Sequence, residues 1–161
     1  MVSKKLHQFV IFASAILFCQ LAGLIGSVFN LTAIDSWYAA LEKPAFSPPN
    51  WIFGPVWVFL FLLMGVSLYL VLSRRKTTRD SRAGLLAFGV QWVLNVLWSF
   101  FFFTLENPLW AFVEIILLLI SILVTVYYFE KINKTAAYLL IPYVLWVAFA
   151  AGLNFSIVVL N

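Results

Sequence analysis

The chain has little of what catalytic and metal sites are usually built from. Its 161 residues include one cysteine, one histidine and six acidic residues. A single cysteine gives no disulfide framework, and His7 lies close to the N-terminus. The sequence also contains no cluster with metal-ligand spacing, no glycine-rich phosphate loop and no nucleophilic triad. We therefore expect neither a metal nor a required cofactor, and composition alone does not indicate an enzyme.

Charge is scarce as well, and it is confined to a few places. Charged residues make up 10% of the chain and hydrophobic residues 65%, with a mean hydropathy of +1.05, whereas about a quarter of a soluble domain is charged. The apolar runs are continuous rather than alternating, which favours helices over strands, and each reaches the roughly 20 residues that span a bilayer. The sequence therefore predicts a single-domain, all-α integral membrane bundle over 1–161, with five spans at about 7–29, 51–73, 83–105, 108–129 and 135–160.

The basic residues predict the orientation of these spans. Nine of the ten flank one side of the predicted bundle, and only Lys43 lies on the other. Because cytoplasmic loops of membrane proteins carry the excess of Lys and Arg, we expect a multi-pass protein of the cell membrane with its N-terminus in the cytoplasm and its C-terminus outside. This pattern accounts for the net charge of +4, so we predict the lipid bilayer as a partner and no nucleic acid.

The longest connection, 35–50, is unusually stiff and aromatic. Proline fixes φ and removes a backbone donor, so the prolines hold the loop in an extended shape. One interpretation is a rigid lid over the bundle. The other is an anchor whose tryptophans lie among the lipid headgroups. The residues assigned to the lid are Lys43, Pro44, Pro48 and Pro49.

Polar and large aromatic residues inside the spans point to an internal site. Glu114 would cost roughly 2.5–3.5 kcal/mol at the centre of a span, so it serves either an interhelical hydrogen bond or a ligand or proton. At 1.5 Å per residue, most of these side chains fall in the half of the bundle beneath the lid, where aromatic walls suit a flat apolar ligand. The predicted ligand-binding residues are Trp37, Tyr38, Trp51, Asn95, Trp98, Glu114, Trp146, Ala150 and Asn154.

These residues belong to a pattern that covers nearly the whole chain and resembles the TspO/MBR family, the tryptophan-rich sensory proteins and translocator proteins. The matching positions are Trp37-Tyr38, Leu41, Lys43-Pro44, Pro48-Pro49, Trp51, Pro55-Val56-Trp57, Met64-Gly65, Gln91, Leu94-Asn95, Trp98, Phe102-Phe103, Glu114, Pro142-Tyr143, Trp146, Phe149-Ala150 and Leu153-Asn154. The resemblance implies a five-helix bundle, often dimeric, with a pocket closed by the first loop. It also implies binding of porphyrins, such as haem, and of isoquinoline and benzodiazepine-type ligands. Small residues spaced by four, either Ala83 and Ala87 or Ala22 and Gly26, would let helices of a homodimer pack closely.

Two departures from the family pattern lie at the end of the last span. Phe155 stands where the sterol motif of eukaryotic members has tyrosine, and Val159 stands where that motif has a basic residue. Some bacterial members degrade porphyrin in light and have tryptophan at the position of Phe155. These departures weaken the case for both properties. We therefore favour a receptor or sensor that tunes porphyrin levels or stress signalling, over a transporter of lipophiles or a light-dependent porphyrin-degrading enzyme.

Overall fold

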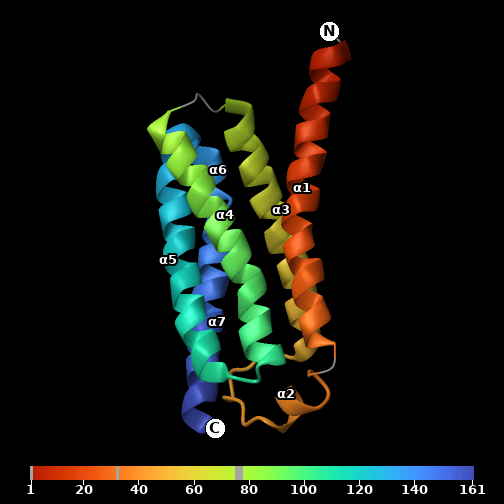
Figure 1. Ribbon diagram of the computed structural model, residues 1–161, viewed down its shortest axis with the longest axis vertical. Helices are drawn as coiled ribbons and strands as arrows, with labels where there is room; N and C mark the ends of the chain where they lie inside the picture. Colours follow the sequence, from red (N-terminus) through yellow and green to blue (C-terminus); the bar gives the residue numbers. More distant parts are fainter. Residues whose placement is uncertain (1, 32, 75–77) are drawn as a thin grey trace.

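The computed structural model describes residues 2–31, 33–74 and 78–161, and every regular element in this part of the chain is helical. Five segments of the described chain are long and apolar enough to cross a membrane, which confirms the predicted five-helix bundle (Figure 1). The helices are α1 (Val2–Asn30), α2 (Trp37–Ala40), α3 (Asn50–Arg74), α4 (Arg79–Ser99) with the π-helical turn η1 (Phe100–Thr104), α5 (Pro108–Ile132), α6 (Lys134–Tyr138) and α7 (Ile141–Leu160).

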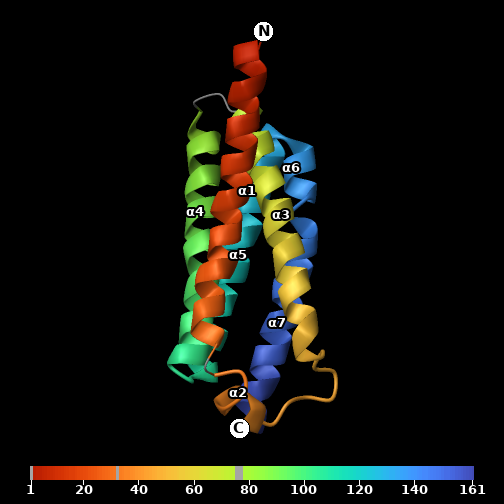
Figure 2. The ribbon, with the colours of Figure 1, turned by 90° about the vertical axis from the view of Figure 1, so that its right-hand side faces the viewer.

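The two ends of the bundle differ in chemistry. The short helix α2 and the loop that leads to α3 cross one end, here called the lid end (Figures 1 and 2). The opposite, basic end carries the N-terminus and the connections that precede α4 and α6. Described basic residues at this end include Lys4, Lys5, Arg74, Arg79, Arg82, Lys131 and Lys134, whereas Arg75 and Lys76 lie outside the described residues. The predicted separation of basic residues is therefore present along the axis of the bundle.

Glycine contacts hold α1 against α3, at Gly65 in the basic-end half and at Gly23 near the middle of the bundle. A Cβ added at Gly65 would lie 2.7 Å from the Cα of Ile16, and one at Gly23 would lie 2.8 Å from the Phe61 ring. Such distances are shorter than real Cβ contacts, so a larger residue at Gly65 would push the helices apart, and one at Gly23 would displace the Phe61 ring. Cys19 and Met64 are fully buried in the same part of the core.

The small residues considered for dimerisation have different surroundings. Gly26 faces α4 of its own bundle, since a Cβ there would lie 3.1 Å from Ser99 Oγ, and Ala22 is buried. These two residues therefore serve packing within one bundle. Ala83 and Ala87 on α4 are half-buried, and a homodimer through that helix stays a prediction.

Two predicted boundaries differ from the structure. The span predicted at 135–160 is interrupted, because α6 ends at Tyr138 and α7 begins at Ile141. Pro142 then lies in the first turn of α7, where its missing N–H leaves no hydrogen bond unmade. The span predicted at 83–105 begins earlier, at Arg79, because Thr78 and Ser81 form a capping box.

The turn between α4 and α5 contains a strained residue. Glu106 has a φ of 50°, the left-handed conformation that costs an L-residue about 1–2 kcal/mol. The next residue, Asn107, caps α5 by accepting a hydrogen bond from the Trp110 N–H at 3.1 Å. The cap and the adjoining helices hold the turn in this shape.

We predict that Glu106→Gly stabilises the protein by up to about 1 kcal/mol, because glycine relieves the strain but loses about 0.5–1 kcal/mol of unfolded-state freedom. Thermal unfolding in detergent measures the change. Glu106→Ala is the matched control, since alanine removes the same side chain and keeps the strain. An equal rise in melting temperature for both variants would show that the side chain, not the backbone, is responsible.

The separation of basic residues predicts the orientation in the membrane. In a chain with Cys19→Ala, a membrane-impermeant maleimide added outside intact cells should label Ala45→Cys at the lid end and miss Lys134→Cys at the basic end. Both positions are exposed, so accessibility to solvent does not distinguish them. Labelling of Lys134→Cys alone would reverse the assignment.

Candidate ligand-binding cavity

A cavity of about 530 Å³ lies inside the lid-end half of the bundle, within the range of about 300–1,000 Å³ typical of ligand sites. Its lining side chains are mostly apolar and aromatic. The walls come from five segments, namely Gln20 to Ile34 on α1 and its end, Tyr38 on α2, Asn50 to Phe61 on α3, Asn95 to Phe103 on α4 and η1, and Ala150 to Ile157 on α7.

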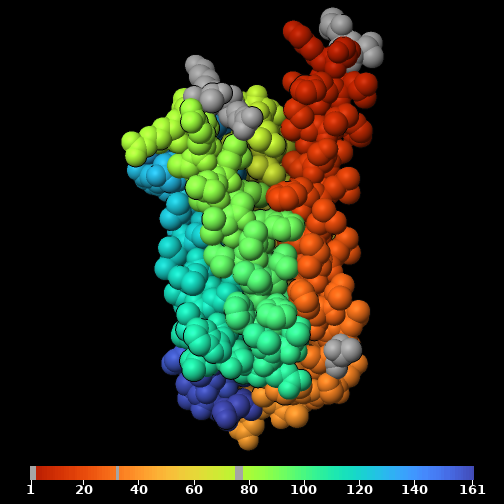
Figure 3. Space-filling model, in the orientation of Figure 1, coloured from red at the N-terminus to blue at the C-terminus, as the bar shows by residue number. Residues whose placement is uncertain are grey.

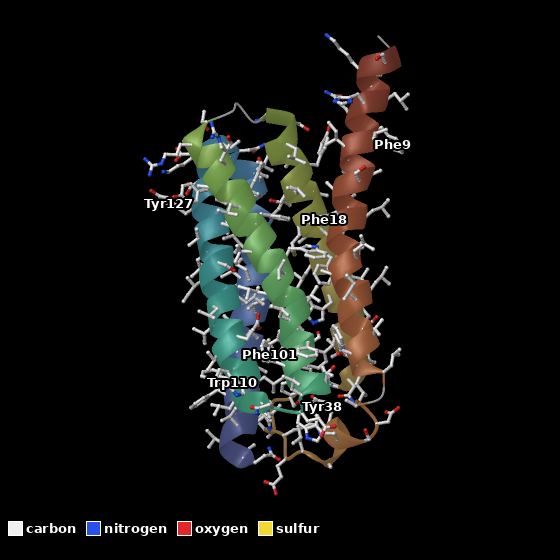
Figure 4. The ribbon with its side chains drawn as sticks, in the orientation of Figure 1. Phe9, Phe18, Tyr38, Phe101, Trp110 and Tyr127 are labelled. Atoms are coloured by element: carbon white, nitrogen blue, oxygen red, sulfur yellow. The ribbon has the colours of Figure 1, made fainter. Side chains whose placement is uncertain are left out.

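The lid closes the cavity through Tyr38. This side chain is buried, and its ring lies 6.0 Å from the Phe102 ring and 5.8 Å from the Phe103 ring (Figure 4). Lys43 Nζ lies 4.6 Å from the centre of the Tyr38 ring and donates hydrogen bonds to the Ala39 and Leu41 carbonyls. Burial raises the pKa of the Tyr38 hydroxyl, so the lid presents a neutral phenol to the bundle.

A second contact ties the lid to α7. The Glu42 N–H donates to Asn161 Oδ1, and Asn161 Nδ2 donates to the Glu42 carbonyl, both at 3.0 Å. Asn161 Nδ2 also donates to the Ile157 carbonyl at 2.9 Å. We call the paired contact between Asn161 and Glu42 the latch. Sequence reasoning missed it, because an asparagine beyond the last helix carries no motif that names a partner.

Polar groups on the far wall hold α4 to its neighbours. Trp98 Nε1 donates to Asn154 Oδ1 at 3.1 Å, and Asn154 Nδ2 donates to the Pro108 carbonyl at 2.8 Å. Asn95 Nδ2 donates to the Tyr143 hydroxyl at 2.8 Å. Since water is scarce at this depth, these bonds fix the positions of the side chains that face the cavity.

Aromatic rings form the broad surfaces of the cavity. The Trp98 ring stacks on Phe102, with centres 5.1 Å apart and planes at 19°, and the Trp57 ring stacks on Phe61 at 5.4 Å and 26°. Trp37 packs edge-on against Phe102, with ring centres 5.4 Å apart. The stacked pairs present flat, apolar surfaces whose orientations are set by neighbouring rings.

The structure brings together six of the nine residues that the sequence assigned to the site. They all line the cavity: Tyr38, Trp51, Asn95, Trp98, Ala150 and Asn154. Asn95 and Trp98 are three residues apart on α4, and Ala150 and Asn154 are four apart on α7, so each pair shares one face of its helix. No ligand contact is thereby established for these residues, and their role in binding stays a prediction.

Three assigned residues lie away from the cavity. Trp37 contacts the Phe102 ring, which lines the cavity, but does not line the cavity itself. Trp146 packs edge-on against Phe53 at 5.8 Å and lies in a separate apolar groove between α3 and α7, so the prediction that it lines the cavity is wrong. Its neighbour Phe53 occupies the cavity wall at that point.

Glu114 does not reach the cavity either. Its side chain is buried in the helical core, and neither carboxyl oxygen has a hydrogen-bond partner among the described residues. The Gln91 amide is buried in the same way, with both polar atoms unpartnered in the described chain. The interhelical hydrogen bond considered for Glu114 is therefore not made in this structure, and ligand contact through the cavity is not available to it.

The residues assigned to the lid lie in a loop across the end of the bundle and not in the wall of the cavity. The loop carrying Lys43, Pro44, Pro48 and Pro49 crosses the end of the bundle between α2 and α3 (Figure 2), and none of the four lines the cavity. Sequence reasoning also missed most of the contribution of α1. The one available signal was the run of small residues at Ala22, Gly23 and Gly26, which leaves space beside the helix.

Comparison with known proteins bears on what this cavity is. The model of the TspO/MBR family matches residues 15–160. The chain is 40% identical to the tryptophan-rich protein TspO of Chlorobaculum tepidum, over 96% of this chain and 98% of that protein. It is 45% identical to the tryptophan-rich protein TspO of Archaeoglobus fulgidus, over 86% and 89% of the two chains, and 35% identical to the human translocator protein, over 75% and 72%. The five-helix membrane bundle with its lid-end cavity therefore belongs to the TspO/MBR family.

Proposed function

We propose that the protein is a membrane receptor or sensor that binds porphyrins and related flat lipophilic molecules in the lid-end cavity. The observation that carries the proposal is the cavity itself, an apolar space of about 530 Å³ with stacked aromatic walls beneath a closed lid. In the proposed orientation, the lid faces the outside of the cell membrane.

The chemistry of the walls supports a flat ligand. Trp98 and Phe102 together offer a broad ring surface, on which a planar π-system gains both apolar burial and stacking. Asn95 and Asn154 add a few polar atoms on the same side, held in place by Tyr143 and Trp98. A large apolar surface with few fixed polar groups is typical of sites for lipophilic ligands.

Packing beneath the cavity favours binding over passage across the membrane. Towards the basic end, the bundle is closed by large side chains that are almost completely buried, among them Phe61, Met64 and Tyr143. These belong to one continuous core that extends to Phe88 and Phe129. A transporter would need this core to open, whereas a receptor needs only the cavity and its access.

The first prediction fills the cavity from α7. Ala150→Phe should weaken porphyrin affinity by about tenfold or more, because the new ring occupies space that the ligand requires. Absorbance titration of the purified protein measures the affinity. Ala148→Phe is the matched control, since the same ring is added two residues away on an exposed face of the same helix. Equal affinities for the two variants, both folded by thermal melt and monodisperse, would contradict binding in this cavity.

The second prediction separates the tryptophans. Trp98→Ala should weaken porphyrin affinity by roughly 5- to 150-fold, by analogy with base–aromatic stacking at about 1–3 kcal/mol. Trp146→Ala should leave affinity nearly unchanged, because Trp146 lies outside the cavity, and so should Trp110→Ala, whose side chain is exposed on α5 (Figure 4). A loss with Trp146→Ala but not with Trp98→Ala would move the site to the groove between α3 and α7.

A further inference from the structure

The exposed lining residues of the cavity all gather on two helices. On α1 they are Leu24 and Ser27, with Leu31 just beyond the end of the helix, and on α3 they are Asn50, Trp51, Gly54 and Val58. Apart from the neighbours Asn50 and Trp51, successive members of each set are three or four residues apart, so each set forms one stripe. Leu24 is 63% exposed and Val58 is 58% exposed, although both line the cavity.

The other walls are closed. The lining residues of α7 are all buried, with Ala150, the most exposed of them, at 8%. On α4 and η1, Asn95, Ser99 and Phe102 are buried as well. The face over α5, α4 and α1 shows side chains of α1 and α4 meeting along the lid-end half (Figure 3). The cavity therefore opens sideways, between α1 and α3.

Helix packing explains why the opening lies there. The helices α1 and α3 touch at Gly65 in the basic-end half and at Gly23 near the middle of the bundle, and Gln20 Nε2 donates to the Val58 carbonyl at 3.0 Å. Nearer the lid the two helices diverge (Figure 2), and a Cβ added at Gly54 would meet nothing within 4 Å.

Over the same length, α1 stays beside α4. Gly26 lies against Ser99, and the Phe29 and Phe100 rings are 5.6 Å apart. Since α1 follows α4 while α3 leans away, the space between α1 and α3 widens towards the lid. The Gln20 hydrogen bond to Val58 marks the inner edge of this opening.

The opening lies at the depth of the lipid chains. Leu24 is six residues from the end of α1, or roughly 9 Å at 1.5 Å per residue, and Val58 is eight residues into α3, or roughly 12 Å. Both positions are inside a hydrocarbon core of roughly 30 Å. At this depth the rim consists of the apolar Leu24 and Val58 side chains, which face lipid rather than water, whereas Asn50 and Trp51 lie at the lid end of α3.

We propose that this opening is a lateral port, through which molecules dissolved in the lipid-chain region enter the cavity directly from the bilayer. The lid then serves as a roof against water, because Tyr38 packs on Phe102 and the latch ties Glu42 to Asn161. The substrate class follows from the route: apolar molecules that partition into the lid-side leaflet. The proposal rests on the proposed function for the identity of the ligand, but not for the route.

A thiol inside the cavity tests the route without porphyrin. In a chain with Cys19→Ala, Ala150→Cys places the thiol on the cavity wall, and the protein is reconstituted into phosphatidylcholine vesicles. The probe is a long-chain N-alkylmaleimide dissolved in the bilayer, and the rate of adduct formation is followed by mass spectrometry. Because every variant carries the same thiol, its intrinsic reactivity cancels in the comparison.

Three further substitutions identify the path. Gly54→Trp places a large ring at the rim, whereas Gly152→Trp adds the same ring at an equally open glycine on α7 that does not line the cavity. Asn161→Ala removes the latch. We expect Gly54→Trp to slow labelling by about tenfold or more at an unchanged final extent, and we expect Gly152→Trp and Asn161→Ala to leave the rate unchanged.

The opposite pattern would overturn the port. If Asn161→Ala accelerates labelling while Gly54→Trp has no effect, ligands enter under the lid. Absence of labelling by the lipid-dissolved reagent, with labelling by a small water-soluble maleimide retained, would also overturn it. Normal lateral labelling in a protein that fails to bind porphyrin would instead refute the proposed function and leave the port standing.

Discussion

The close approach of α1 and α3 determines the rest of the site. Gly65 and Gly23 let the two helices touch from the basic-end half to the middle of the bundle, and Ile16 and Phe61 occupy the places where larger residues would have their side chains. α1 also packs on α4, where the Phe18 and Trp92 rings stack, and this second contact continues towards the lid through Gly26 and the ring of Phe29. Nearer the lid, α1 therefore keeps only one of its two partners. The cavity and its lateral opening are the space left where the first contact ends.

Few polar side chains are buried in the described chain, and Asn95 and Asn154 among them fix the walls of this space. Within a bilayer, a buried polar group without a partner is costly, so Asn154 is satisfied by Trp98 and the Pro108 carbonyl, and Asn95 by Tyr143. The aromatic rings that they support then keep their orientation. Glu114 is buried on α5 without lining the cavity, so an acidic residue within a span does not by itself identify the site.

Composition was enough to predict the five spans, because lipid imposes continuous apolar runs. The helix repeat also places Asn95 beside Trp98 and Ala150 beside Asn154 in the cavity wall. Periodicity failed for Trp146. Its side chain lies in the groove between α3 and α7 rather than in the cavity, where Phe53 of α3 forms the wall, and helix spacing on α7 alone does not reveal this. The role of α1 and the latch at Asn161 depend on contacts between distant segments, which no local pattern encodes. The interruption between α6 and α7 changes only where the last helix begins and leaves the number of spans as predicted.

The central claim is that a flat lipophilic molecule occupies the space between α1, α3, α4 and α7. Photo-crosslinking of a porphyrin analogue carrying a diazirine, followed by peptide mapping, tests this most directly in the reconstituted protein. The account predicts adducts on the cavity walls, at residues such as Leu24, Trp98 and Leu153, that disappear when unmodified porphyrin competes. Competable adducts confined to the groove around Trp146 and Phe149, or to the exposed face of α5, would contradict it.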